Sequence, residues 1–272
     1  MEQQIPYSVP GTVQRTMHSR NGNREYRIFV FKPAHAAPPS GYPVVYLLDA
    51  NSIFASVAEA VRLQSRRAGG VEPFVIAGIG YPTDEPFARV RRFFDYTVEA
   101  TLEQLPHRPD GFSLPATGGA ELFLDFIENE LKPSIEREIP IDRKRQALFG
   151  HSLGGLYALH VLFTRPGLFQ AYIAGSPSLW WKNKYLFDEA QRLRSRMNQA
   201  NAAVSLMIAV GGQEKPFMIE DAERMAKSLS SADIPGLRLT YSYFGDEGHV
   251  SVLPPIISAA LRFMSGSSPT PR

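Results

Sequence analysis

The residues with the clearest chemical potential form the sequence Gly-His-Ser-Leu-Gly at positions 150–154, with Ser152 at its centre. A mainly apolar run, Gln146–Phe149, precedes this sequence, and a helix-like run, Leu156–Phe163, follows it. A serine in a tight turn between a strand and a helix is typical of a nucleophile elbow, where the neighbouring glycines tolerate a strained backbone and the hydroxyl stands clear of the sheet. The pattern predicts that Ser152 is the nucleophile of a serine hydrolase.

His249 is the predicted base, because a serine hydroxyl is a weak nucleophile until a neighbouring group accepts its proton. It follows an alternating run of β-branched and aromatic residues, Leu237–Phe244, in a loop able to carry it over the carboxyl edge of a sheet. His151 adjoins the nucleophile, and we expect the neighbour of an elbow serine to point away from the site. We expect structural or solvent-facing roles for the other histidines, which are His18, His35, His107 and His160.

Glu214 is the predicted acid that orients the base. It follows the strand-like run Val204–Val210 across a short turn rich in glycine, and doubly wound serine hydrolases place their members in the chain order serine, acid, histidine. Asp246 and Glu247 compete for this role, since both lie close to His249 in the sequence.

The tetrahedral intermediate of acyl transfer carries a negative oxygen, which needs preorganised hydrogen-bond donors. The amide of Leu153, directly after the nucleophile, is the first predicted donor. The second is expected from the loop after the apolar run Pro43–Leu48, where Ala50 is our choice and Asn51 the alternative. The same loop is able to cap a following helix.

Composition excludes several other classes of protein. The chain has 272 residues, 44% hydrophobic and 21% charged, with a net charge of +2 that is too small to predict nucleic-acid binding. Zero cysteines exclude disulfides and thiolate chemistry. We find no apolar segment long enough to span a membrane and no signal-peptide pattern, so we expect a cytoplasmic protein without membrane partners, or a periplasmic or secreted one if a signal peptide was removed. No metal cluster, phosphate loop or dinucleotide fingerprint is present, so no metal and no cofactor are predicted; oligomeric state is left open.

Apolar runs alternate with helix-like runs along the chain, which predicts an α/β fold with a mostly parallel central sheet and helices on both faces. Residues 1–264 are expected to form one domain, and residues 265–272, rich in Ser and Pro, a disordered tail. The predicted strands are Glu25–Phe31, Pro43–Leu48, Phe74–Ile79, Gln146–Phe149, Ala171–Ala174, Val204–Val210 and Leu237–Phe244. The predicted helices are Ile53–Gln64, Glu121–Glu138, Leu153–Phe163 and Ile219–Ser230.

Residues 89–119 interrupt this alternation with interleaved prolines and glycines. Only Val98–Leu105 has a helical pattern there. Long irregular segments in compact domains are often lids or binding loops, and we expect this one to be a lid-like insertion that walls the substrate pocket.

Taken together, these residues resemble the esterase D-type or putative esterase group of the α/β-hydrolases, and most closely its enterochelin (siderophore) esterase-like branch. The resemblance runs from about Tyr26 to Met264. It implies Ser152 as nucleophile, His249 as base and the amides of Ala50 and Leu153 as oxyanion donors. The family usually has glycine where this chain has Ala50, and some members work with a Ser-His pair alone, which leaves the role of Glu214 open. The matching blocks are Leu47–Asn51, Gly78–Pro82, Asp95–Thr97, Glu130–Pro133, Gly150–Gly155, Ser176–Trp181 and Gly248–His249.

The resemblance implies a small-molecule ester as substrate, either a catecholate siderophore of the enterobactin or bacillibactin kind, whose trilactone core is cut, or a simpler acyl or aryl ester. A general carboxylesterase is therefore the alternative, and a non-catalytic binding module on the same fold is a third hypothesis. Cations near the irregular segment fit an anionic catecholate, and tryptophans supply a flat wall. The predicted substrate-binding residues are Arg89, Arg92, Trp180, Trp181 and Tyr81, with Arg91 as a further cation.

Overall fold

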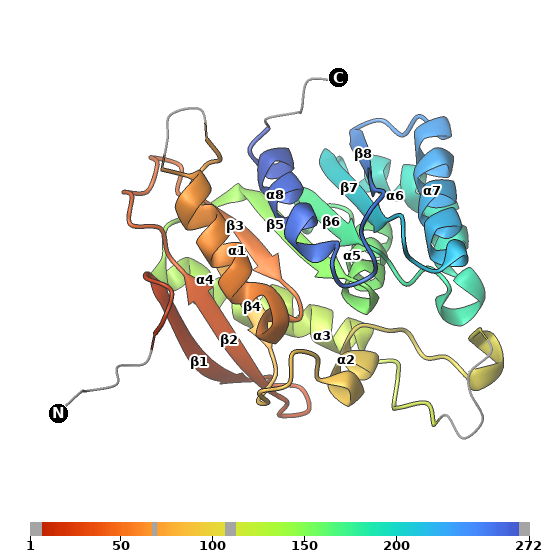
Figure 1. The fold of residues 1–272 in the computed structure, drawn as a ribbon, viewed down its shortest axis with the longest axis horizontal. Helices are drawn as coiled ribbons and strands as arrows, with labels where there is room; N and C mark the ends of the chain where they lie inside the picture. The colour runs from red at the N-terminus through yellow and green to blue at the C-terminus, as the bar shows by residue number, and fades with distance from the viewer. Residues whose placement is uncertain (1–6, 67–69, 107–112, 267–272) are drawn as a thin grey trace.

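The computed structural model describes residues 7–66, 70–106 and 113–266, and its eight-stranded sheet has the order β1-β2-β4-β3-β5-β6-β7-β8 (Figure 1). From β4 to β8 neighbouring strands run parallel, whereas β1 and β2 are antiparallel to their neighbours. The strands are β1 (Thr12–His18), β2 (Glu25–Phe31), β3 (Tyr42–Leu47), β4 (Val75–Gly80), β5 (Ile141–His151), β6 (Ala171–Gly175), β7 (Val204–Gly211) and β8 (Leu237–Phe244).

The predicted α/β architecture and all seven predicted strands are confirmed. The sequence pattern did not reveal β1, which lies outside β2 as the edge strand. Its residues show the half-exposed pattern of an edge, including Val13 at 64% exposure, and so lack the continuous apolar run that marked the central strands.

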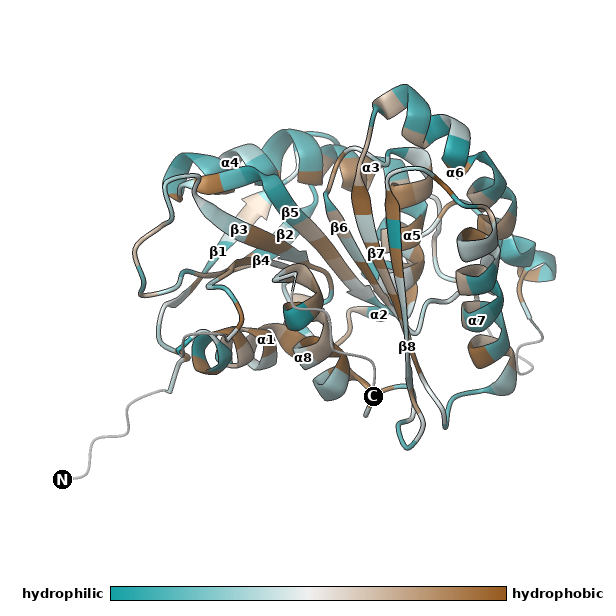
Figure 2. Cartoon of the chain, turned by 90° about the horizontal axis from the view of Figure 1, so that it is seen from above, coloured by the Kyte–Doolittle hydropathy of each residue, from teal (hydrophilic) through white to brown (hydrophobic). Residues whose placement is uncertain are grey.

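Helices cover both faces of the sheet, with α1 and α8 on one side and α3 to α7 on the other (Figure 2). The structure adds α6 and α8, which the sequence pattern did not single out. The helices are α1 (Ala50–Gln64), α2 (Arg89–Asp95), α3 (Ala120–Phe126), α4 (Lys132–Glu138), α5 (Leu153–Thr164), α6 (Leu186–Ala200), α7 (Pro216–Ser231) and α8 (Leu253–Met264).

Two hydrophobic cores lie on the two faces of the sheet, because successive side chains of a strand point to opposite sides. Along β3, Val44 and Tyr46 belong to the core under α3 to α7, whereas Val45 and Leu47 belong to the core under α1 and α8. The apolar runs that predicted central strands are thus residues buried on both faces.

The predicted helix Glu121–Glu138 is one helical stretch with a wider π-helical turn, Ile127–Leu131, between α3 and α4. Pro133 follows this turn and has no amide hydrogen to donate. A π-helical turn accommodates such a break in the ladder without ending the helix.

The segment expected to be irregular contains α2 and a short 3-10 helix, Leu102–Gln104. The predicted helical candidate Val98–Leu105 is therefore wrong in extent, and the helix that does form, α2, precedes it. Residues 107–112 of the expected lid, with His107, and residues 267–272 of the expected tail lie outside the described residues. Within the described ranges, the helices are all too short or too polar to cross a bilayer.

Candidate active site

Ser152 lies in a strained turn between β5 and α5. Its φ of 61° and ψ of −117° lie in a region that side chains disfavour. The turn is held by the Ser152 amide, which donates to the Gly175 carbonyl oxygen at 2.9 Å, and by close backbone packing around the glycines. A Cβ on Gly150 would lie 2.1 Å from the Gly154 oxygen, and one on Gly155 would lie 2.6 Å from the Gly175 oxygen. Glycine is required at both positions.

Three side chains from three loops at the carboxyl edge form a hydrogen-bonded chain. His249 Nε2 lies 3.0 Å from Ser152 Oγ, and His249 Nδ1 lies 2.6 Å from Glu214 Oε2. These contacts fit a tautomer in which Nδ1 donates to the carboxylate and Nε2 accepts from the serine hydroxyl. The structure thus brings together Ser152, Glu214 and His249, which are the three residues that the sequence pattern selected.

The Glu214 carboxylate is fully enclosed, with 0% of its side chain exposed. Its Oε1 accepts from Ser176 Oγ at 2.5 Å and from the Gly211 amide at 2.8 Å. Burial by itself would raise the pKa of Glu214, but the hydrogen bonds from His249, Ser176 and Gly211 outweigh it and hold that pKa below the ordinary value. Glu214 therefore faces His249 as a carboxylate anion.

The competing acids do not share this position. Asp246 is exposed, and Glu247 contributes its main chain, since the Glu247 carbonyl oxygen accepts from the Gln213 amide at 2.9 Å. In the described part of the chain, Glu214 is the carboxylate hydrogen-bonded to His249.

His151 corrects the expectation that the neighbour of the nucleophile points away from the site. Its ring packs against His249, with centroids 4.7 Å apart and planes inclined by 42°. Burial, followed by the charges of His249 and Arg92, lowers the pKa of His151 to about 3. A neutral imidazole therefore packs against the base.

The two predicted oxyanion donors each occupy the first position of a helix, Ala50 in α1 and Leu153 in α5. Amides at this position have no acceptor within their own helix and are free to bind an anion. In the loop between β3 and α1, the residue with a positive φ is Asp49, at 51°. Ala50 has a helical backbone, so position 50 does not require glycine. The Asn51 side chain bonds instead to the main chain of Tyr81 and Thr83 and ties the loop after β4 to α1.

Arg92 is not available as the expected substrate-binding cation. Its Nε and Nη2 donate to the two carboxylate oxygens of Asp49 at 3.0 and 2.7 Å, and its side chain is only 11% exposed. The Asp49 amide in turn donates to Tyr96 Oη at 3.1 Å. A buried bidentate pair of this kind is directional and rigid. Arg92 thus holds the loop that presents the Ala50 amide.

A pocket with a volume of about 260 Å³ opens beside the nucleophile. Trp180 is part of its wall, as expected, but Trp181 is fully buried and donates to the Val98 carbonyl oxygen at 3.0 Å. Tyr81 is also buried, at 1% exposure, and Arg89 is exposed on α2 without lining this pocket. Direct substrate contact by Trp181 and Tyr81 is therefore wrong, because other side chains cover them. The pocket is lined by Pro106, Ser152, Ser178, Trp180, Lys215, Phe217, Met218 and His249.

Sequence reasoning missed several of these residues. Lys215, Phe217 and Met218 follow Glu214 directly, so their place next to the predicted acid was an available signal. Ser176 and Ser178 lie in the matching block Ser176–Trp181, but their contacts with Glu214 and Ser152 depend on how β6 pairs with β7 and with β5. The described residues contain no cluster of His, Cys, Asp or Glu that could hold a metal ion.

Comparison with known proteins agrees with this geometry. The family model described as "Putative esterase" matches residues 19–249. The chain is 48% identical to the ferri-bacillibactin esterase BesA of Bacillus subtilis over 94% of this chain and 90% of that protein. It is 31% identical to a siderophore enterobactin esterase of Emericella nidulans over 82% of each chain.

The structure of the BES protein from Bacillus cereus superposes with a TM-score of 0.91 at 41% identity, covering 97% of this chain and 99% of that one. Matches of this extent include the elbow, the loop of the acid and the loop of the base. The chain belongs to the putative esterase family and is an esterase with the α/β-hydrolase fold.

Proposed function

We propose that this protein hydrolyses the ester bonds of a catecholate siderophore through an acyl-enzyme on Ser152. The observation that carries the proposal is the hydrogen-bonded chain from Ser152 through His249 to a buried Glu214. The substrate class is supported by relatives named as bacillibactin and enterobactin esterases.

In the proposed reaction, Ser152 Oγ attacks the ester carbonyl carbon while His249 Nε2 takes the serine proton. The amides of Leu153 and Ala50 donate to the oxyanion. When the intermediate collapses, His249 returns the proton to the departing alcohol and the acyl group stays on Ser152. Water, deprotonated by His249, then releases the acid and restores the serine.

Glu214 has a positioning and electrostatic role in this scheme. Its carboxylate holds the Nδ1 proton of His249, which leaves Nε2 free to accept from serine. The negative charge also stabilises the imidazolium that forms during attack. Ser176 and Gly211 keep the carboxylate oriented toward His249.

The pocket volume bears on how the substrate enters. A space of about 260 Å³ holds one acyl or aryl unit and not a whole trilactone with three arms. We infer that one arm enters at a time and that the remainder of the siderophore stays outside. The same volume suits a short acyl or aryl ester, which is why a general carboxylesterase is the second candidate.

A substrate panel on the wild type and on Ser152→Ala tests both candidates. We expect the wild type to cleave enterobactin and bacillibactin faster than short acyl esters, and the variant to be inert on all of them. Equal or greater turnover of short esters with no cleavage of the trilactones favours the general carboxylesterase. A wild type inert on every ester, with no organophosphate adduct on Ser152 by mass spectrometry, contradicts an enzymatic role and favours a binding module.

A further inference from the structure

Among the residues that the structure describes, Lys215 is the only Lys, Arg, Asp or Glu that lines the pocket beside Ser152 and His249. Trp180 and Phe217 contribute aromatic surface to the same pocket. A cation next to aromatic surface suits an aryl ligand with a negative charge, with an attraction of the size of a solvent-facing pair because Lys215 is exposed.

The main chain of Lys215 is fixed relative to the reacting groups. It directly follows Glu214, whose side chain is held by three hydrogen bonds. The Lys215 carbonyl oxygen accepts from the Met218 amide at 2.8 Å and so begins α7. The positive end of this sixteen-residue helix lies at the same point, and it adds to the positive potential of the ammonium group.

The cations Arg92, Lys184 and Arg91 each have a partner within the protein. Arg92 is paired with Asp49, and Lys184 Nζ lies 2.7 Å from a carboxylate oxygen of Asp221. Arg91 lies over the rings of Tyr26 and Tyr81. By contrast, the ion pairs and side-chain hydrogen bonds among residues 7–66, 70–106 and 113–266 include none for the Lys215 ammonium, whose residue is exposed. It is therefore able to meet a ligand without first breaking an ion pair.

We propose that Lys215 is a specificity-determining residue that binds an anionic oxygen on an aryl group of the substrate. The aryl ring packs against Trp180 and Phe217 while the ester carbonyl reaches Ser152. This inference rests on the proposed esterase function and assigns the recognition of negative charge to α7 instead of the arginines of α2. Lys215 does not touch the reacting atoms, so it acts on substrate binding and not on proton transfer.

A matched pair of esters tests this role: meta-carboxyphenyl acetate, which is anionic, and meta-carbamoylphenyl acetate, its neutral isostere. The readout is the ratio of kcat/KM for the anionic ester to that for the neutral ester. We expect Lys215→Gln to lower this ratio by about fivefold, the size of a solvent-facing charge pair. Lys215→Glu should lower it by about twentyfold, since repulsion replaces attraction. Lys215→Arg should retain most of the wild-type ratio. In Lys215→Gln and Lys215→Glu, the lower ratio should result mainly from a higher KM for the anionic ester.

Lys227→Gln is the control, since Lys227 lies on the same helix but pairs with Glu223 on the surface. Its ratio should equal that of the wild type. High salt should reduce the wild-type ratio toward that of Lys215→Gln.

The outcomes separate this inference from the proposed function. If the wild type cleaves both esters and Lys215→Gln or Lys215→Glu keeps the wild-type ratio, the assignment of Lys215 is overturned and the esterase mechanism stands. An equal fall in the ratio for Lys227→Gln also overturns it, because the effect is then general electrostatics. If the wild type cleaves neither ester and Ser152 accepts no organophosphate, both proposals fail together.

Discussion

The carboxyl and amino edges of the central sheet differ in where residues with a positive backbone φ occur. At the carboxyl edge, residues with positive φ stand just after three strands: Asp49 after β3, Ser152 after β5 and Ser176 after β6. At the amino edge, positive φ occurs at helix ends such as Asn201 and Asp233, where a left-handed residue is the ordinary way to stop a helix. The strained strand-to-helix turns among the described residues therefore lie at the edge that carries Ser152.

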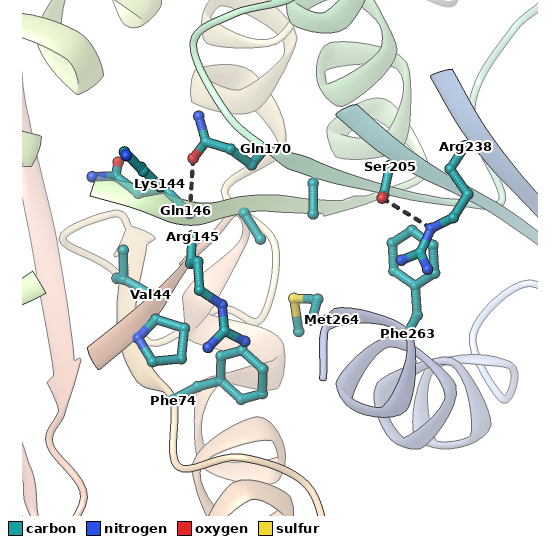
Figure 3. Close-up of a pocket in the computed structure, with 13 residues that line it drawn as sticks. Val44, Phe74, Lys144, Arg145, Gln146, Gln170, Ser205, Arg238, Phe263 and Met264 are labelled. Atoms are coloured by element: carbon teal, nitrogen blue, oxygen red, sulfur yellow. Dashed lines mark hydrogen bonds between the residues drawn. The ribbon is translucent and has the colours of Figure 1, made fainter. Parts of the chain in front are cut away.

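The amino edge also has a pocket, of about 190 Å³, and it contains arginines (Figure 3). Arg145 points to the same side of β5 as Phe74 and pairs with Glu72 at 2.6 Å. Arg238 lies over Phe263, and its Nε donates to Ser205 Oγ at 3.1 Å. Both arginines have protein partners, whereas Lys144 of the same pocket and Lys215 of the pocket beside Ser152 have no ion pair among the described residues. A pocket and a cation occur at both edges, so the feature that distinguishes the carboxyl edge is the strained backbone of its strand-to-helix turns.

Among the variants that test this contrast between the edges, we expect the largest loss of activity when Ser152 is replaced. We expect Ser152→Ala to lower kcat by about a million-fold, because the hydroxyl that contacts His249 Nε2 is removed. Steady-state kinetics on p-nitrophenyl acetate measures this effect, and circular dichroism checks that the variant is folded. Retention of a substantial rate would move the chemistry away from the elbow.

Replacing the acid should be the next largest effect. We expect Glu214→Gln to lower kcat by about a thousand- to ten-thousand-fold, since the amide no longer requires a proton on His249 Nδ1. Asp246→Asn is the matched control and should stay within about twofold of the wild type, as an exposed substitution. The reverse result, a silent Glu214→Gln beside an inactive Asp246→Asn, would transfer the role to Asp246.

The same variant gives a pH dependence of stability. Because the pKa of Glu214 is lowered in the folded chain, its ionised form contributes stability that is fully present above the unfolded-state pKa. This contribution is lost as the pH falls below the ordinary glutamate value of 4.5 and through the folded pKa. Urea unfolding of the wild type and Glu214→Gln should therefore differ most near neutral pH and converge in acid. A difference that grows in acid would contradict the lowered pKa.

Two adjacent glycines test how tightly the elbow is packed. We expect Gly155→Ala to destabilise the fold by about 2 kcal/mol, because its Cβ would meet the Gly175 oxygen at 2.6 Å and backbone would have to move. Gly154→Ala is the control: its Cβ would meet nothing closer than 3.5 Å, and alanine favours a helix. Thermal unfolding of both variants measures the difference. Equal losses of stability in the two variants would mean that the close approach of residue 155 to β6 does not explain the need for glycine. The glycine-flanked serine motif itself would then set that need.

The smallest effect is expected at the amino edge. Arg145→Gln removes a half-exposed ion pair with Glu72, so we expect a loss of about 0.5 kcal/mol or less and unchanged kinetics. Denaturant titration and p-nitrophenyl acetate turnover check both values. A marked loss of activity would show that the two edges are coupled and would break the comparison.

The local sequence pattern predicted most of the strands and several of the helices of this fold. The central strands were predictable because their residues are buried on both faces, and α1, α5 and α7 because their runs lie between such strands. Local pattern failed for α6 and α8. The sequence of α6 is largely polar, with charged residues outnumbering its few buried ones, and α8 opens on Leu-Pro-Pro, a pair of prolines that reads as a break although proline suits a helix's first turn.

The sequence by itself selected Ser152 as the candidate nucleophile and gave the chain order of the candidate serine, acid and base. These depend on short-range features, namely a glycine-flanked serine after a strand and polar residues at strand ends. It also predicted Ala50 and Leu153 as oxyanion donors, and the structure places each at the first position of a helix, where an unpaired amide is a local property.

Only the tertiary structure decided which neighbours those residues have. Arg92 and Asp49 are forty-three positions apart, and pairing them turned an expected ligand for the substrate into a support for the oxyanion loop. Trp180 and Trp181 are adjacent in the chain, yet Trp180 lines the pocket whereas Trp181 is fully buried and does not line it. Burial and partner choice are sums over contacts from distant segments, and no spacing within the chain encodes them.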